Sequence, residues 1–347
     1  MGADTKSINV ALQGGGAHGA FTWGILDRLL EDGRVAIDGI SGTSAGSMNA
    51  VVLAYGLMTG GIAGARSGLE AFWRAVSRAG CLWSPIRTNP WEHWWTGSWN
   101  LDRSPTYMAF SAMTGVLSPY EFNPLDFDPL RRIVADQVDF ARLASCEDIR
   151  LFVSATDVQS GRVRVFQGAD ITIEAVLASA CLPFIHKAVE IDGRAYWDGG
   201  YVGNPSLWPF FYHTATDDLL VMHVNPIERD QVPMTAPEIN NRLNEITFNT
   251  SLIAEMRAIR FVQRLLREDW LKEEHRHRLR DIRVHAIRAD KELMDLSVAT
   301  KLNPDWDFLV DLRDRGRRAA DEWLAANLVH VGVRDTVDLR EEYLVGR

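Results

Sequence analysis

A serine flanked by glycines is the first feature of this sequence that could do chemistry. Residues 42–46 read GTSAG and fit the pattern G-x-S-x-G. In such an elbow the serine occupies a sharp turn from a strand to a helix, and the glycines remove Cβ atoms that would collide across the bend. An apolar strand pattern precedes the motif, and the helix-forming run MNAVVLAYGL follows it. We expect Ser44 to be a nucleophile supported by Gly42 and Gly46; the alternative is a flexible turn without function.

A glycine-rich loop, GGGAHG at residues 14–19, begins 28 residues before the serine motif. Consecutive glycines let backbone N–H groups converge on an anion, and the helix that follows adds the positive end of its dipole. The loop satisfies the dinucleotide pattern G-x-G-x-x-G, and Asp38 stands at the distance of the acid that binds a ribose in such sites. A dinucleotide-binding oxidoreductase is therefore one interpretation.

The second interpretation is an oxyanion hole for the tetrahedral intermediate of acyl transfer. Asp38 lies six residues before Ser44. The first two strands would therefore end with the loop and the serine side by side, at one edge of a parallel sheet. This arrangement favours acyl transfer. The glycines expected to frame the hole are Gly14, Gly15 and Gly16.

A serine nucleophile also needs a base. A triad in the order Ser, Asp, His stays open, although none of the histidines after residue 200 has a telling local context: His213, His223, His275, His277, His285 and His330. Asp198 does have one, because it ends the second arm of an expected hairpin and precedes Gly199 and Gly200. The rigid turn Asn204–Pro205 follows. The alternative for Asp198 is a carboxylate that caps a turn.

Together these motifs resemble the patatin-like phospholipase family of lipid acyl hydrolases, over roughly residues 8–226. The segment ASACLPF, residues 178–184, is similar to the Ser-x-x-x-P segment that precedes DGG in that family. The resemblance implies Ser44 as the nucleophile, Asp198 as the base of a Ser-Asp dyad without histidine, and the glycine-rich loop as the oxyanion hole. It also implies a three-layer α/β/α sandwich that releases fatty acids from lipids and needs no metal or other cofactor.

Two residues depart from the family's pattern. His18 occupies a slot where the family usually has Arg or Lys, so positive charge beside the oxyanion hole would depend on pH. Gln13 stands where an Asp or Ser often precedes the glycines. Neither departure removes a member of the dyad. Because a free aspartate is a weak base at neutral pH, we expect Asp198 to be partly desolvated, with Tyr196 and Trp197 as candidate walls.

The elements that would position these residues alternate between short apolar runs and helical patterns, which predicts βαβ units and a largely parallel sheet. The expected strands include residues 8–13, 151–157, 162–166 and 219–224, and the expected helices include residues 21–30, 48–57 and 171–180. The dipeptide Asp192–Gly193 predicts a hairpin between two further short strands. The fold class is therefore α/β, with a largely parallel central sheet.

We expect two parts along the chain: a hydrolase domain over residues 7–230 and a charged, mainly helical extension over residues 231–347 that packs on it. In the extension, residues 239–256 and 308–323 have the apolar stripes of amphipathic helices, and IRVHAIR between them alternates like a strand.

Two further classes of function stay open beside the dinucleotide enzyme. One is a noncatalytic lipid-binding protein that keeps the fold. The other is an α/β-hydrolase with a histidine-containing triad, which we favour less because its elbow normally follows several strands. Ser44 has room for one βα unit before it.

Composition narrows the partners and the compartment. The chain has 347 residues, 46% of them hydrophobic, and a net charge of −9 at pH 7. This acidic balance argues against nucleic acid as a partner, and three widely spaced cysteines predict neither a disulfide framework nor a zinc site. No signal-peptide pattern opens the sequence, and the longest uncharged run, residues 39–65, holds seven glycines. We therefore expect a cytoplasmic protein without a membrane span, peripheral to a membrane at most.

A tryptophan-rich segment is the last candidate, since five of the twelve tryptophans lie within residues 83–99. Such rings could line an acyl channel, cover the site or lie at a lipid interface; the alternative is an irregular segment held by aromatic packing. We expect residues 83–107 to form a cap or lid, with His93 as a surface or packing residue. The expected partners are a lipid or acyl-ester substrate, a transient contact with a membrane surface and, as an open alternative, a second copy of the chain.

Overall fold

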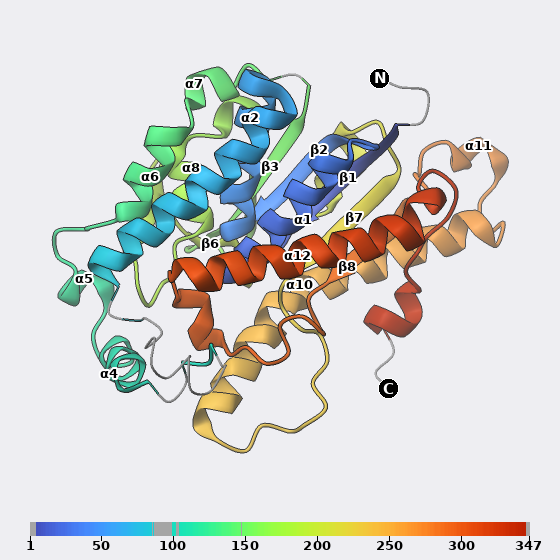
Figure 1. The fold of residues 1–347 in the computed structure, drawn as a ribbon. Coiled ribbons are helices and arrows are strands. Elements are labelled where there is room, and N and C mark those ends of the chain that lie inside the picture. Colours follow the sequence, from blue (N-terminus) through green and yellow to red (C-terminus); the bar gives the residue numbers. More distant parts are fainter. Residues whose placement is uncertain (1–4, 85, 87–98, 102–103, 147, 345–347) are drawn as a thin grey trace.

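One mainly parallel β-sheet runs through the centre of the molecule (Figure 1). The computed structural model of the protein describes residues 5–84, 86, 99–101, 104–146 and 148–344. The sheet formed by these residues has eight strands in the order β5-β6-β3-β2-β1-β7-β8, with β4 also paired to β3. The pairs β3–β4, β3–β6 and β5–β6 are antiparallel, and the other pairs are parallel. The strands are β1 (Lys6–Leu12), β2 (Val35–Thr43), β3 (Arg150–Asp157), β4 (Val163–Gln167), β5 (Val189–Ile191), β6 (Arg194–Asp198), β7 (Asp218–His223) and β8 (Arg283–Arg288).

Helices cover both faces of the sheet, so the expected three-layer α/β/α sandwich is confirmed. α1, α2, α8 and α12 pack on one face, and α9 and α10 pack on the other. The longer helices are α1 (Gly19–Asp32), α2 (Ala45–Trp83), α4 (Pro105–Thr114), α6 (Pro129–Gln137), α8 (Ile173–Ser179), α9 (Trp208–His213), α10 (Ala236–Arg267) and α12 (Trp306–Asn327). The shorter ones are η1 (Gly16–His18), α5 (Pro119–Phe122), α7 (Phe140–Leu143), η2 (Gly168–Asp170), η3 (Gly199–Tyr201), α11 (Glu273–Arg276), η4 (Val298–Leu302), η5 (Leu328–His330) and η6 (Arg340–Leu344).

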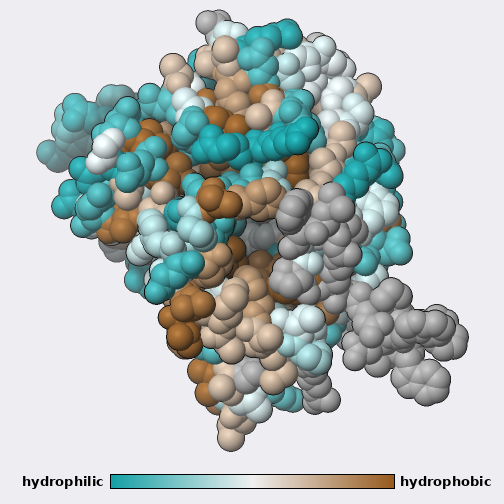
Figure 2. All heavy atoms as spheres, turned by 90° about the vertical axis from the view of Figure 1, so that its left-hand side faces the viewer, coloured by the Kyte–Doolittle hydropathy of each residue, from teal (hydrophilic) through white to brown (hydrophobic). Residues whose placement is uncertain are grey.

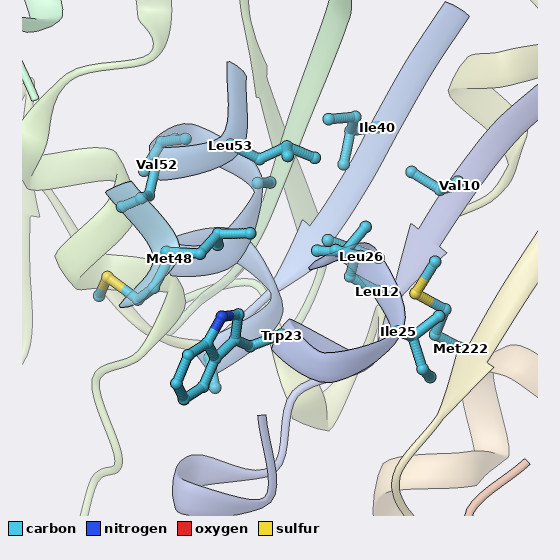
Figure 3. Packing of buried hydrophobic residues seen from close by; sticks show 14 of the residues in the cluster. Val10, Leu12, Trp23, Ile25, Leu26, Ile40, Met48, Val52, Leu53 and Met222 are labelled. Carbon is cyan, nitrogen blue, oxygen red and sulfur yellow. The ribbon is translucent and has the colours of Figure 1, made fainter. Parts of the chain in front are cut away.

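The alternation of side chains along β1 separates the two helical layers. Val10 and Leu12 belong to the cluster under α1 and α2, whereas Ala11 between them belongs to the cluster under α9 and α10. Figure 3 shows Val10 and Leu12 together with Trp23 of α1 and Met48 of α2, which belong to the same cluster. A strand that is buried on both faces needs apolar residues at successive positions, which is why these strands could be recognised as short apolar runs.

Helix α2 is much longer than the expected helix of residues 48–57. Its backbone is interrupted at Gly61, where φ is 59°. Residues Ala45–Gly80 of this helix are long and apolar enough to cross a membrane, and half of their most apolar stretch is buried inside the fold. Buried core helices share this length and composition, so the feature is weak evidence for a membrane span.

The extension adds to the sheet as well as to the helical layers. The expected strand IRVHAIR is observed as β8, which pairs with β7 along its whole length, and α10 and α12 correspond to the two expected amphipathic helices. The boundary at residue 230 falls in the loop between β7 and α10. The division into 7–230 and 231–347 stays a prediction.

The tryptophan-rich segment is described only in part. Four of its tryptophans and His93 lie outside the residues whose side chains are described: Trp83, Trp91, Trp94 and Trp95. Trp99 is described; it is 9% exposed, and its ring packs on Phe308 of α12 with 5.3 Å between centroids. The cap or lid of residues 83–107 stays a prediction.

Candidate active site

Ser44 occupies the turn between β2 and α2 in a backbone conformation that side chains rarely adopt. Its φ is 56° and its ψ is −125°. A Cβ at Gly42 would lie 2.6 Å from the carbonyl oxygen of Gly46, and a Cβ at Gly46 would lie 2.2 Å from that of Leu12. Gly42 is therefore required by the tight turn of the elbow itself, and Gly46 by the close approach of the elbow to the end of β1. Strained backbone of this kind is concentrated at functional sites.

The register of the sheet brings Ser44 level with Asp198. Thr43 at the end of β2 pairs with Ser154 of β3, and the next residue of β3, Ala155, pairs with Asp198 at the end of β6. β3 therefore lies between the two strands that carry these side chains, at a strand spacing of about 5 Å on each side. Residues that are 154 positions apart in the sequence meet at one edge of the sheet.

The two glycines after Asp198 let this edge close. A Cβ at Gly199 would lie 2.2 Å from the carbonyl oxygen of Ser154, and a Cβ at Gly200 would lie 2.3 Å from the ring of Phe248 on α10. Larger residues would push the end of β6 away from its neighbours. The DGG sequence is thus explained by close packing of a carboxylate between β3 and α10.

The Asp198 side chain is fully buried, with 0% exposure. Its Oδ1 accepts a hydrogen bond from the Gly200 N–H at 2.7 Å, and the Ser44 hydroxyl lies close enough to the carboxyl group to lower its pKa. Oδ2 has no partner of normal hydrogen-bond geometry among the described residues. Burial outweighs these interactions and raises the pKa of Asp198 to about 7.

Trp197 does not form the expected wall beside Asp198. Successive side chains of a strand point to opposite faces, and Trp197 lines a separate groove with Tyr201 and Phe184. Tyr196 lies on the same face as Asp198 and packs against Phe166. The burial of Asp198 comes instead from the way β6, β3 and α10 enclose it.

The glycine-rich loop lies against the serine elbow. A Cβ at Gly14 would lie 2.6 Å from the Ser44 Cβ. The Gly14 N–H donates to Asn204 Oδ1 at 2.7 Å, so it is not free to bind a substrate oxygen. The N–H groups of Gly15 and Gly16 have no acceptor among the described residues. Within the described part of the chain, two of the three glycines expected to frame the hole therefore keep a free N–H donor.

Gln13 and Ser179 hold the loop and the elbow in place. Gln13 Oε1 accepts hydrogen bonds from the backbone N–H groups of Val224 and Asn225, at 3.0 and 3.1 Å, and its Nε2 donates to Asn249 of α10. This buried amide explains why a neutral residue precedes the glycines here. The Ser44 N–H donates to Ser179 Oγ at 2.9 Å, which gives the ASACLPF segment a structural role.

His18 is not a cation in this site. It is buried, and burial followed by the charges of Lys301 and two arginines holds its pKa well below the ordinary value of 6.5. Its Nε2 contacts Thr300 Oγ1 at 2.7 Å. Because that hydroxyl donates to the Ser297 carbonyl, the histidine must donate from Nε2. The lowered pKa predicts a neutral His18 near pH 7, so the positive charge expected at this position would appear only at lower pH.

Lys301 of η4 supplies positive charge where the sequence did not indicate it. Its Nζ donates to Asn225 Oδ1 at 2.7 Å and to Asn244 Oδ1 at 2.9 Å. Burial lowers the pKa of Lys301 to about 8, and this cation in turn lowers the pKa of Asp198. No local motif marks this lysine, which stands 257 positions after Ser44 in the sequence.

A cavity of about 450 Å³ opens above Ser44. Figure 2 shows apolar side chains, in brown, around a hollow on the face of the molecule that carries α4 and α5. The described lining is largely apolar and includes Met48, Phe72, Trp73, Phe110, Leu182, Phe184 and Phe248. The volume and the apolar lining of this cavity are those of a site for a small organic ligand. Both suit an acyl chain.

The other candidate groups lie elsewhere. The late histidines do not line the described part of this cavity; His186 does, and burial lowers its pKa. Asp38 is the unpaired residue of a bulge near the start of β2, and its carboxylate accepts hydrogen bonds from the N–H groups of Ala215 and Thr216. It therefore lies five positions before Thr43, which ends β2 beside the glycine-rich loop. Among the described residues, no group of three or more His, Cys, Asp or Glu is placed to hold a metal ion.

Comparisons with known proteins give a family match and several similar solved structures. The model of the family described as patatin-like phospholipase matches residues 10–211. No curated protein matches the sequence. Similar solved structures include VipD from Legionella pneumophila, with 16% identity and a TM-score of 0.37, over 90% of this chain and 67% of that one. They also include full-length ExoU from Pseudomonas aeruginosa in complex with SpcU, with 14% identity and a TM-score of 0.32, over 93% of this chain and 53% of that one. This chain thus spans about half the length of ExoU.

Proposed function

Since this chain belongs to the patatin-like phospholipase family, we propose that it releases fatty acids from lipid esters through a dyad of Ser44 and Asp198. The enzyme class, a lipid acyl hydrolase, comes with the family. The residues that carry the reaction are our proposal. It is supported by one observation above all: a strained serine and a buried carboxylate meet at the floor of an apolar cavity.

In the proposed reaction, Asp198 accepts the proton of the Ser44 hydroxyl as its oxygen attacks the ester carbonyl. The N–H groups of Gly15 and Gly16 then stabilise the oxyanion, each contributing about 3 kcal/mol to transition-state binding. Asp198 returns the proton to the leaving alcohol. Water repeats the cycle on the acyl-enzyme and releases the fatty acid.

The dinucleotide alternative has less support. Its acid, Asp38, would have to reach a ribose beside the glycine-rich loop, but it lies five positions before the end of β2, and its carboxylate is engaged by two backbone N–H groups. In an open α/β sheet the ligand lies at the carboxyl ends of the strands. The noncatalytic alternative predicts the same fold and is separated from ours by experiment.

Covalent capture tests the proposed nucleophile. Incubation of the whole chain with a fluorophosphonate should yield one adduct, which peptide mass spectrometry should locate on Ser44, together with fatty-acid release from an ester substrate. Labelling depends on an activated serine, so a noncatalytic protein gives no adduct. Binding of NAD without labelling would contradict the proposal and favour the dinucleotide enzyme.

We also propose that the protein works at a membrane surface, through the apolar face around the cavity mouth. Residues 104–127 include two charged side chains, Glu121 and Asp126. Large apolar side chains of this segment are exposed, with Val116 at 83% and Leu125 at 91%. Phe184 is 66% exposed and lines both the cavity above Ser44 and the neighbouring groove. An exposed apolar face that leads into a lipid-binding cavity is suited to a lipid interface.

The change Leu125→Asp tests this contact. Burial of one leucine in lipid is worth about 1.5–3 kcal/mol, so we expect the rate on phospholipid vesicles, divided by the rate on a soluble short-chain ester, to fall about tenfold or more. Val333→Asp is the matched control, because Val333 is 68% exposed in the C-terminal part of the chain and lies outside this face. An equal ratio in the wild type and both variants would count against a role for this face.

A further inference from the structure

Among the described residues that line the cavity above Ser44, one carries a charge at pH 7, and it is Lys301 with its ammonium group. The rest of the described lining is apolar or neutral, since burial lowers the pKa of His186. A neutral acyl chain needs no cation in its binding site. A charge in such surroundings is costly unless something compensates it, so this lysine calls for an explanation.

The hydrogen bonds that Lys301 makes to described residues do not include one to a carboxylate. A lysine ammonium has three N–H donors, and two of them bind the neutral oxygens of Asn225 and Asn244. No carboxylate oxygen of the described residues lies within 4.0 Å of Nζ. By contrast, the neighbouring Arg229 forms an ion pair with Glu245 at 2.6 Å.

The fold fixes this ammonium beside the glycine-rich loop. A Cβ at Gly16 would lie 2.4 Å from the carbonyl oxygen of Lys301, so η4 packs directly on the loop. Asn225 links the two, because its Oδ1 accepts from Lys301 and its Nδ2 donates to the Gly14 carbonyl at 2.8 Å. On the other side, Nζ lies 5.4 Å from the ring centre of Phe248.

We infer that Lys301, held by Asn225 and Asn244, binds an anionic group of the substrate while the ester carbonyl lies at Ser44. The substrate class is then an acyl ester that carries a phosphate or a carboxylate near the scissile bond. An anionic oxygen would accept the remaining N–H of the ammonium in a charge-assisted hydrogen bond, the strong kind in a site with little water. This inference rests on the proposed function and deepens it.

The charged and titratable groups around Lys301 shift its pKa in opposite directions. Asp198 of β6 and Glu245 of α10 raise its pKa, whereas burial and Arg229 lower it, and His18 of η1 is neutral. With a pKa of about 8, the lysine is mostly protonated at pH 7 and loses its charge as the pH rises through 8. A preference for anionic substrates should therefore fade over that range.

Matched substrates test the inference: 1-decanoylglycerol, its 3-phosphate, and the decanoyl ester of glycerate, which carries a carboxylate. For the wild type at pH 7, we expect kcat/KM to be about tenfold or more higher for at least one anionic ester than for the neutral one. The two anionic esters distinguish phosphate from carboxylate recognition. In Lys301→Met this preference should fall about tenfold. Lys291→Met, which removes an exposed lysine outside the cavity lining, should keep it.

Several results would overturn the inference. One is equal kcat/KM for all three esters in the wild type, and another is an unchanged preference in Lys301→Met. A third is a Lys301→Met variant that changes only the pH profile, because the lysine then acts on Asp198 alone. If Lys301→Met does not fold, the wild-type preference must still fall between pH 7 and 9, and a constant preference contradicts us. If none of the three esters is hydrolysed, the proposed function is overturned, and this inference falls with it.

Discussion

The change Ser44→Ala is expected to reduce kcat for ester hydrolysis by about 10⁴-fold or more, since loss of a nucleophile removes the covalent route altogether. The rate that remains would come from binding and from the oxyanion donors alone. Fatty-acid release from a soluble ester, measured at saturating substrate, is the direct test. The backbone strain at position 44 persists in alanine, so the variant should keep the unfolding midpoint of the wild type within a few degrees.

Ser111→Ala is the matched control for this experiment. Ser111 lines the same cavity as Ser44, but it lies on α4 and its backbone has an ordinary helical conformation. Nearby buried serines are already engaged; Ser47 Oγ, for example, donates to the Ser44 carbonyl at 2.6 Å. If Ser44→Ala keeps more than a hundredth of the wild-type kcat, or if Ser111→Ala loses as much, the nucleophile has been assigned to the wrong residue.

The parts of this site that could be predicted from the sequence are those fixed by local sterics. A turn as tight as that at Ser44 needs small residues on both sides, so Gly42 and Gly46 predict the turn from the local sequence alone. The DGG sequence at Asp198 is a similar case. The central strands could be recognised because burial on both faces demands apolar residues at successive positions.

The parts that could not be predicted depend on contacts between distant segments. Three glycines in a row suggested three donors, but Asn204, 190 positions away, binds the N–H of Gly14. His18 appeared to be a pH-dependent cation, but η4 buries it and Lys301 stands nearby. Trp197 seemed a wall for Asp198 because it is adjacent in sequence, whereas strand alternation sends it to the other face. In the first two cases the deciding contact comes from a distant segment, and in the third a neighbour in sequence was taken as a neighbour in space.

The change Asp198→Asn is the second large effect that we expect. General-base catalysis contributes about 10²–10⁴-fold, and kcat should fall by that factor. The asparagine keeps the shape of the side chain, and its Oδ1 can still accept from the Gly200 N–H. Two controls separate this role from others. Asp157→Asn removes a carboxylate at the end of β3 that forms an ion pair with Arg194 of β6. His186→Ala removes the histidine that lines the cavity.

The pH dependence of the wild type gives this assignment its own signature. A base must be deprotonated to work, and burial raises the pKa of Asp198 to about 7. kcat/KM should therefore fall about tenfold per pH unit below 7 and level off above it. The raised pKa also means that folding favours the protonated carboxyl group, so its contribution to stability is present at low pH and is lost as the pH rises through 7. Asp198→Asn should lose this rate dependence, and its free energy of unfolding should change less than that of the wild type between about pH 4 and pH 7. Full turnover in Asp198→Asn, with loss of activity in His186→Ala, would instead identify a histidine as the base.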